Sequence, residues 1–378
     1  MGGGSAPGSS GRRRYLRVVR PSCRQPVAGE PRFPRRRART PPCDSSVSVR
    51  RPRLPVLALL ALAAVGCGRP GERCEPLTLS ARTTGGTQAS GPLDQGLVVA
   101  RLAGARTIGD STRLVNRYDP SSRRAAAVYL AALLGEIGLD ARVHNYDVRL
   151  GEEGWRYCGA NVYATVPATV DSAGPRVVLG AHYDSRTRGA QDRRNENAGP
   201  MPGANDNASG VALVLSVAEA ALRAPHRARP LTVVLLDQEE LGLVGARAFA
   251  EKLGDENVPV HSVHTVDQVG WDADGDRAVE IELPSPSLEA LYRSAAATVG
   301  VPARVTDVGT TDHSAFRAAG FEAVGVTEEY DGGDTTPHYH EPTDTADTVD
   351  LDYLASATRV VWAAIERVLT AGPGGGTP

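Results

Sequence analysis

The chain has 378 residues, 41% of them hydrophobic and 23% charged, which is ordinary globular composition and excludes a disordered or fibrous protein. The net charge of −2 is unevenly distributed: residues 1–66 hold 14 arginines and 2 acidic residues, which leaves 28 basic and 42 acidic residues in the remainder. Because nucleic-acid-binding proteins present a basic patch to phosphate, this acidic body argues against a nucleic-acid partner.

The N-terminal region contains the pattern of a bacterial export signal. Three arginines precede an apolar run at 54–65, and small residues lead to Cys67. This run is too short to cross a membrane, which takes about 20 apolar residues. The residues at 64–67 resemble a lipobox, whose cysteine is lipidated and becomes the first mature residue. We therefore predict a lipoprotein signal peptide at 47–66 and an exported, lipid-anchored protein of the cell envelope, with ordinary secretion and a chance apolar run as alternatives.

Composition divides the rest of the chain. Residues 1–46 are rich in Arg and Pro and have no apolar period, so they are either a disordered extension or lie upstream of the true translation start. Residues 67–95 are rich in Gly, Thr, Ser and Pro and are predicted to be a lipid-anchored linker. A single catalytic domain is expected at 96–371, and a Gly-rich disordered tail at 372–378.

The cysteine count predicts one disulfide in the exported chain. Once Cys67 carries a lipid, Cys74 and Cys158 remain as an even pair in an oxidising compartment. A bond between them would tie the linker to the domain. The alternative is two unrelated thiols, because the sequence does not test the geometry that a disulfide needs.

Helical and strand patterns alternate along the domain. An apolar stripe at 97–104 begins it, and a stronger helical pattern follows, after which short apolar runs alternate with helical ones. This alternation predicts an α/β fold with a mostly parallel, twisted sheet sandwiched between helices. The predicted strands lie at 143–148, 160–166, 176–181, 231–236, 260–266 and 323–326, and the predicted helices at 121–138, 209–222, 243–253, 287–299 and 351–369.

Polar residues follow the ends of three predicted buried strands, and others lie in a Gly/Asn-rich loop and near the C-terminus. In an open parallel sheet, ligands bind beyond the carboxyl ends of the strands, so these side chains should gather at one edge. Imidazole and carboxylate groups are ligands of zinc, and a divalent cation would relieve the repulsion among the carboxylates. The residues are His182, Asp184, Asp206, Glu239, Glu240, Asp267, His340 and Asp344.

This ordered set resembles the secreted bacterial di-zinc aminopeptidases, the leucyl aminopeptidase-like family of zinc exopeptidases. The resemblance covers roughly 97–369. It is carried by Ala-His-Tyr-Asp-Ser at 181–185, Gly-Ala-Asn-Asp-Asn-Ala-Ser-Gly at 203–210, Glu-Glu-Leu-Gly-Leu-Val-Gly at 239–245, Asp-Gln-Val-Gly at 267–270 and His-Glu-Pro-Thr-Asp-Thr at 340–345.

The resemblance implies a site with two Zn²⁺ ions per chain. Asp206 would bridge the ions, with His182 and Asp267 on one metal and Glu240 and His340 on the other. His340 is preferred over His338 as the last ligand because it alone has the family's spacing to Pro342, Asp344 and Thr345.

The resemblance also implies roles for residues around the metals. Glu239 would be the general base acting on a water that bridges the two zinc ions, and Asp184 would hold His182 in one tautomer. Asp312 and His313 lie in a segment similar to one near the family's substrate, and Asp344 lies in the segment that carries the last ligand. For His313, a place in the pocket and structural hydrogen bonding both remain open.

The predicted function is an exported metallo-aminopeptidase acting on peptides with a free N-terminus, in contact with the membrane through its lipid anchor only. Alternatives are a single-zinc glutaminyl cyclase, another metallohydrolase of this fold, and a non-catalytic surface lipoprotein that binds a partner. Related carboxypeptidases often carry a lid domain between the fourth and fifth ligands. The stretch between Asp267 and His340 is already filled by predicted elements, so a lid domain does not fit.

Overall fold

The computed structural model describes residues 74–79, 92–150, 155–188, 199–331 and 333–372. All of them belong to one unit of the chain, Leu62–Pro378. The predicted extension at 1–46, the signal peptide at 47–66, the lipidation site Cys67 and the tail from 373 onward lie outside the described residues. In the described part, no helix is both long enough and apolar enough to cross a membrane.

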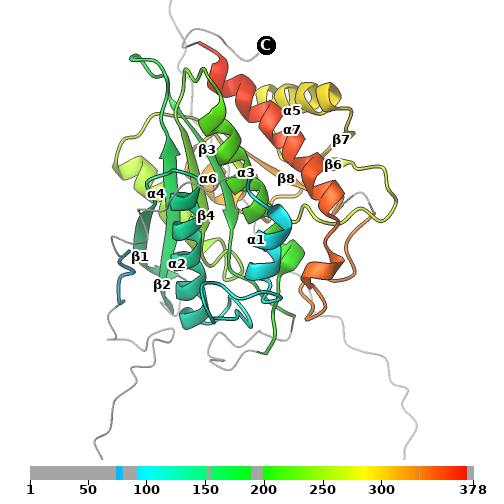
Figure 1. The fold of residues 1–378 in the computed structure, drawn as a ribbon. Coiled ribbons are helices and arrows are strands. Elements are labelled where there is room, and N and C mark those ends of the chain that lie inside the picture. The colour runs from blue at the N-terminus through cyan, green and yellow to red at the C-terminus, as the bar shows by residue number, and fades with distance from the viewer. Residues whose placement is uncertain (1–73, 80–91, 151–154, 189–198, 332, 373–378) are drawn as a thin grey trace, which may run out of the picture. The chain divides into compact units, whose positions relative to one another are not determined.

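Eight strands form one sheet in the order β1-β2-β4-β3-β5-β8-β6-β7 (Figure 1). The four central strands, β4, β3, β5 and β8, run parallel. At one edge β2 pairs antiparallel with β4 and with β1, and at the other β6 pairs antiparallel with β8 and parallel with β7. The strands are β1 (Arg142–Leu150), β2 (Trp155–Val166), β3 (Arg176–His182), β4 (Leu231–Leu236), β5 (Val260–Val266), β6 (Val279–Glu282), β7 (Ala303–Thr306) and β8 (Ala323–Thr327).

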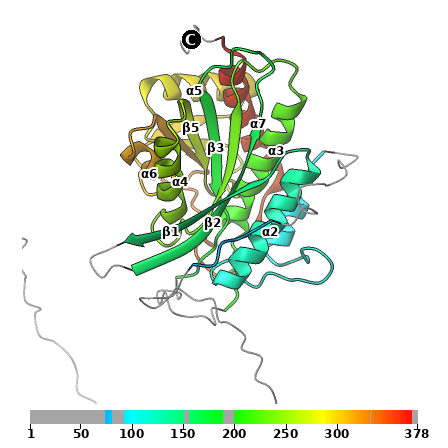
Figure 2. The same cartoon turned by 90° about the vertical axis from the view of Figure 1, so that its left-hand side faces the viewer.

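Helices cover both faces of the sheet. In Figure 2, α4 and α6 lie on one side, and α2, α3 and α7 lie on the other. Several helices begin where the sequence supplies a cap. The Asp119 side chain accepts the backbone N–H of Ser122 in the first turn of α2. The Asp350 side chain accepts the backbone N–H groups of Asp352 and Tyr353 in the first turn of α7. The helices are α1 (Gln95–Leu102), α2 (Pro120–Glu136), α3 (Gly210–Arg223), α4 (Val244–Asp255), α5 (Pro286–Val299), α6 (His313–Ala318) and α7 (Leu351–Thr370).

The central strands are buried on both faces, which explains their continuous apolar runs. Successive side chains of a strand point to opposite faces. Val177 and Leu179 of β3 therefore pack in the larger core with α3 and α7, whereas Val178 packs in a second core with Phe249 of α4 and Phe316 of α6. The predicted α/β fold with a mostly parallel sheet is confirmed.

Among the α-helices and β-strands, three were not predicted from the sequence: β6, β7 and α6. The two strands have four residues each and the helix has six. Segments this short do not complete enough turns or alternations to give a readable period. The place of β6 depends on pairing with β8, and β7 in turn pairs with β6. The place of α6 depends on packing against β5 and α4, which lie far from it in the sequence.

Part of the predicted linker packs against the sheet. Leu77 is buried in the larger core, and its backbone N–H and C=O both bond to the side chain of Asn145 on β1. The structure also joins Cys74 to Cys158 of β2 by a disulfide, with 5.5 Å between the Cα atoms. Residues 74–79 of the predicted linker are therefore held to the edge strands of the sheet.

Replacing both Cys74 and Cys158 by serine should lower the free energy of unfolding by about 4 kcal/mol. The crosslink closes a loop of 84 residues, and releasing it returns loop-closure entropy to the unfolded chain. Urea denaturation of the oxidised protein and of the double variant measures the difference. Equal stability of the two proteins would contradict a structural role for this bond.

Candidate metal centre

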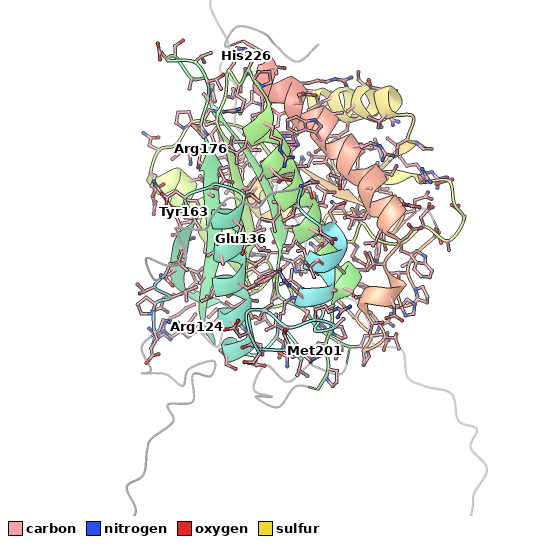
Figure 3. All side chains as sticks on the ribbon, viewed as in Figure 1. Arg124, Glu136, Tyr163, Arg176, Met201 and His226 are labelled. Carbon is pink, nitrogen blue, oxygen red and sulfur yellow. A yellow bond between two sulfur atoms is a disulfide. The ribbon has the colours of Figure 1, made fainter. Side chains whose placement is uncertain are left out.

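The predicted site residues lie where the parallel strands end. In Figure 3, Arg176 at the start of β3 lies toward the upper end of the sheet, and Met201, just before the loop that carries Asp206, lies at the lower end. His182 is the last residue of β3, and Asp267 directly follows β5. The carboxyl ends of the buried strands therefore bring together side chains that are distant in the sequence.

The five predicted ligands form two groups that share one residue. Nε2 of His182 lies 3.3 Å from Oδ1 of Asp206 and 3.3 Å from Oδ1 of Asp267. Nε2 of His340 lies 3.1 Å from Oδ2 of Asp206 and 3.1 Å from Oε2 of Glu240. Within each group the candidate ligand atoms lie within 4.8 Å of one another. Asp206 therefore presents one carboxylate oxygen to each group.

The Asp206 loop is held from both sides. Gly203 has a φ of 56°, and a Cβ there would lie 2.6 Å from the Cβ of Ser185, so this close approach requires glycine. The carboxylate of Asp344 accepts the backbone N–H of Asn205 at 2.8 Å and that of Asp206 at 3.0 Å. Asp344 thus lies next to the site and acts on the backbone that positions Asp206.

A buried arginine, Arg117, also anchors this loop, and the sequence analysis did not single it out. Its fully buried guanidinium donates to the backbone carbonyls of Tyr183, Pro202 and Gly203. Burial lowers the pKa of Arg117 to about 10, although nearby carboxylates oppose the shift. No local pattern marks this residue, because its partners come from distant loops.

Asp184 joins one ligand to the Glu239–Glu240 turn. Its Oδ1 lies 3.4 Å from Nδ1 of His182, so the other ring nitrogen faces the ligand group. The same carboxylate accepts the backbone N–H of Glu239 at 3.0 Å and that of Glu240 at 3.2 Å. A single buried acid therefore orients a histidine and fixes the backbone of two adjacent glutamates.

Replacing Asp184 by asparagine should weaken zinc binding about 10- to 100-fold, the usual effect of removing a group that orients a metal ligand. Competition with a chromogenic zinc chelator measures the affinity. Asp140→Asn, at an exposed surface aspartate, is the matched control and should bind zinc as the parent chain does. Unchanged affinity of the Asp184 variant would show that His182 needs no such support.

The charges of the site are suited to a divalent cation. Burial alone would lower the pKa of His340, but hydrogen bonds with Asp206 and Glu240 outweigh it and raise the pKa to about 10. Burial, with the charge of Asp206, raises the pKa of Glu240 to about 7, and its Oε1 is buried with no hydrogen-bond partner among the described residues. A divalent metal would take the place of these protons and give that oxygen a partner.

Glu239 faces a cavity of about 250 Å³ next to the ligands. The cavity is also lined by Asp206, Glu240, Asp267 and His340. Burial and the charge of Glu240 raise the pKa of Glu239, against the opposing influence of His182. A half-buried glutamate with a raised pKa, next to a metal-ligand set, can take up and release a proton.

The remaining predicted residues, Asp312 and His313, are buried and do not line the cavity. Asp312 is buried, and burial raises its pKa to about 8. His313 is fully buried, lies 2.8 Å from Oγ1 of Thr311, and has its pKa lowered by burial to about 4. Neither residue lines the cavity, so for His313 the structure favours structural hydrogen bonding over a place in the pocket.

His338 lies outside both ligand groups. Its Nδ1 is 3.0 Å from Oγ1 of Thr343, and its ring packs against Trp271. Sequence reasoning missed several cavity residues, among them Glu282, Tyr330 and Tyr339. Tyr339 stacks on the ring of His340, and its position next to that histidine was the one signal in the sequence that could have found it.

Two ligand groups with a common carboxylate, next to a glutamate and a cavity, are typical of metal-dependent hydrolases. The sequence profile of Peptidase family M28 matches residues 161–365, more than half of the chain, and the chain belongs to this family. The resemblance stated from the motifs is therefore confirmed at the level of the family.

Two relatives show how far the likeness extends in sequence. The chain is 27% identical over 199 residues to the aminopeptidase YwaD of Bacillus subtilis, which is 50% of this chain and 40% of the relative. It is 27% identical over 205 residues to the probable lipoprotein aminopeptidase LpqL of Mycobacterium tuberculosis, 46% of this chain and 39% of the relative. The matches thus span less than half the length of either relative.

Solved structures show the same fold. A zinc aminopeptidase from Bacillus subtilis, BSAP, superposes with a TM-score of 0.60 at 15% identity, over 74% of this chain and 95% of that one. A glutaminyl cyclase from Porphyromonas gingivalis does so with a TM-score of 0.58 at 18% identity, over 72% and 96%. Since the fold is common to a peptidase and a cyclase, the likeness in structure does not select the reaction.

Proposed function

We propose that the chain is an exported aminopeptidase that removes N-terminal residues from peptides at a site for two zinc ions. The observation that carries this proposal is the placement of Asp206, with one oxygen directed to each ligand group. Membership of Peptidase family M28 and the names of the relatives support the reaction. The acidic body of the chain agrees with a substrate that has a free α-amino group and argues against a nucleic-acid partner.

Each of the two ligand groups would hold one zinc ion. His182 and Asp267 would hold one zinc ion, Glu240 and His340 would hold the other, and Asp206 would hold both. When bound, zinc polarises a substrate carbonyl and lowers the pKa of water.

Glu239 is the proposed general base. It accepts a proton from the attacking water and passes that proton to the leaving nitrogen. The acids of the two ligand groups are engaged: Asp206 and Asp267 contact His182, and Glu240 contacts His340. The hydrogen bond from the Glu239 backbone N–H to Asp184 keeps the base in place.

Export and anchoring form a separate part of the proposal. The signal pattern at 47–66 and its final Cys67 would attach the mature chain to the outside of a bacterial membrane by lipid alone. The Cys74–Cys158 disulfide agrees with an oxidising compartment. Metabolic labelling with a radioactive fatty acid should mark the parent chain and leave the Cys67→Ser variant unlabelled. Labelling of both would contradict lipidation at this residue.

Zinc content and amide hydrolysis together test the reaction. The purified protein should hold about two zinc ions per chain and hydrolyse aminoacyl p-nitroanilides with a free amino group but not their N-acetylated forms. One zinc ion with cyclisation of N-terminal glutamine in place of amide hydrolysis would select the glutaminyl cyclase alternative. A metal-free, inactive protein would select the non-catalytic binding alternative.

A further inference from the structure

One carboxylate in the cavity, that of Glu282, has no part in the proposed mechanism. Glu282 is the last residue of β6, and its side chain is 1% exposed although it lines the cavity. Its Oε2 accepts the Thr311 hydroxyl at 2.7 Å and lies 3.4 Å from Nδ1 of His313. Among the described residues, Oε1 has no hydrogen-bond partner. One oxygen is therefore anchored, and the other is left for a ligand.

No cation of the described chain neutralises Glu282. His313 is neutral, because burial keeps its pKa near 4, and no arginine or lysine in the described ranges bonds to the carboxylate. Burial, with the nearby charges of Asp267 and Glu280, raises the pKa of Glu282 to about 8 against the Thr311 hydrogen bond. A cation placed beside this oxygen would stabilise the ionised form.

The sheet sets the distance between Glu282 and the ligand groups. Glu282 pairs with Gly325 of β8, and Gly325 pairs with Thr265 of β5, two residues before Asp267. Two strand spacings, about 10 Å, separate Glu282 from Thr265, and the two residues from Thr265 to Asp267 add about 7 Å along the strand direction, so the backbones of Glu282 and Asp267 lie about 12 Å apart. The first side chain of a peptide whose scissile carbonyl lies at Asp267 could span this distance if it has a long stem, as lysine and arginine do.

The surroundings of Glu282 form a polar pocket with room for this carboxylate. A Cβ on Gly325 would lie 2.1 Å from Oε2 of Glu282 and 2.7 Å from Nδ1 of His313, so glycine leaves space for both side chains as they are placed. The cavity wall here carries the hydroxyls of Thr310, Thr311 and Thr327. The same cavity is also lined by Leu243, by Val308 and by Arg186, whose guanidinium donates to the backbone carbonyl of Glu240.

We propose that Glu282 is a specificity-determining residue that binds the cationic side chain of an N-terminal lysine or arginine. This inference rests on the proposed aminopeptidase function and names the substrate class of the same site. The Oε1 atom of Glu282 would accept a hydrogen bond from the ammonium or guanidinium group, and the threonine hydroxyls would solvate it.

Lysine and norleucine test the proposal directly, because norleucine has the carbon stem of lysine without the ammonium group. For the full chain, kcat/KM should be about 10- to 100-fold higher on lysyl p-nitroanilide than on norleucyl p-nitroanilide, the effect of one hydrogen bond to a charged group. The Glu282→Gln variant should lose most of this preference. Glu280→Gln is the matched control, since Glu280 is buried on the same strand, bonds to the Asp331 N–H, does not line the cavity, and should leave the ratio unchanged.

Equal or better hydrolysis of the norleucyl substrate by the parent chain would overturn the proposal, and this comparison needs no variant to fold. A lysyl preference that persists in Glu282→Gln would overturn it as well. Calorimetric binding of free L-lysine and L-norleucine to the zinc-loaded protein separates the two proposals. Tighter binding of lysine without any amide hydrolysis would support the pocket while contradicting the aminopeptidase function.

Discussion

Glu239→Gln should lower kcat by about 100- to 10,000-fold and leave the zinc content of the chain nearly unchanged. Glutamine keeps the size of the side chain but accepts no proton from water, so the variant loses general acid–base catalysis. Glu239 is not in either ligand group, and its backbone contact with Asp184 does not involve the carboxylate. The variant should therefore lose catalytic rate while it keeps its zinc content.

The measurement pairs steady-state hydrolysis of an aminoacyl p-nitroanilide with metal analysis by mass spectrometry. Glu251→Gln, on the exposed surface of α4, is the matched control and should keep full activity. A fully active Glu239 variant would show that another group takes the proton. Loss of zinc together with activity would instead place Glu239 among the ligands.

Asp206→Ala should remove both metals, lowering zinc from about two ions per chain to fewer than one, and should abolish hydrolysis. Each ligand group has three members, and Asp206 is the one member that both contain. Removing it leaves each ion with two protein ligands, too few for a stable zinc site. No other residue of the site is expected to have this double effect.

His340→Ala provides the comparison that makes this result specific. It removes a ligand from one group only, so about one zinc ion should remain. His338→Ala changes a histidine two residues away that contacts Thr343 and Trp271, and it should retain both ions. Equal zinc loss in the Asp206 and His340 variants would argue for a single metal ion, and two ions in the Asp206 variant would refute the bridging role.

Much of the site could be predicted from the sequence because its signals are local. His182 and Asp267 follow apolar runs that are strands on any reading of the pattern, and the carboxyl ends of parallel strands meet at one edge. His340 could be separated from His338 by spacing alone. The structure places His340 in a ligand group and His338 outside it.

The parts that were missed depend on pairing between distant segments. Arg117 anchors the Asp206 loop through carbonyls at 183, 202 and 203, and no pattern near residue 117 indicates those partners. The packing of Leu77 in the core and the bonds of its backbone to Asn145 were also missed, because its segment forms no helix or strand that a sequence pattern could mark.

The sequence by itself determined the α/β class, the family motifs and the ligand candidates, since hydrophobic period and motif spacing are written along the chain. Only the tertiary structure decided that Asp206 faces two groups, that Asp184 supports both His182 and the glutamate pair, and that Glu282 enters the cavity. Glu282 lies on a four-residue strand whose place is set by pairing with β8. Such placement follows from the packing of the whole sheet, which no short stretch of sequence encodes.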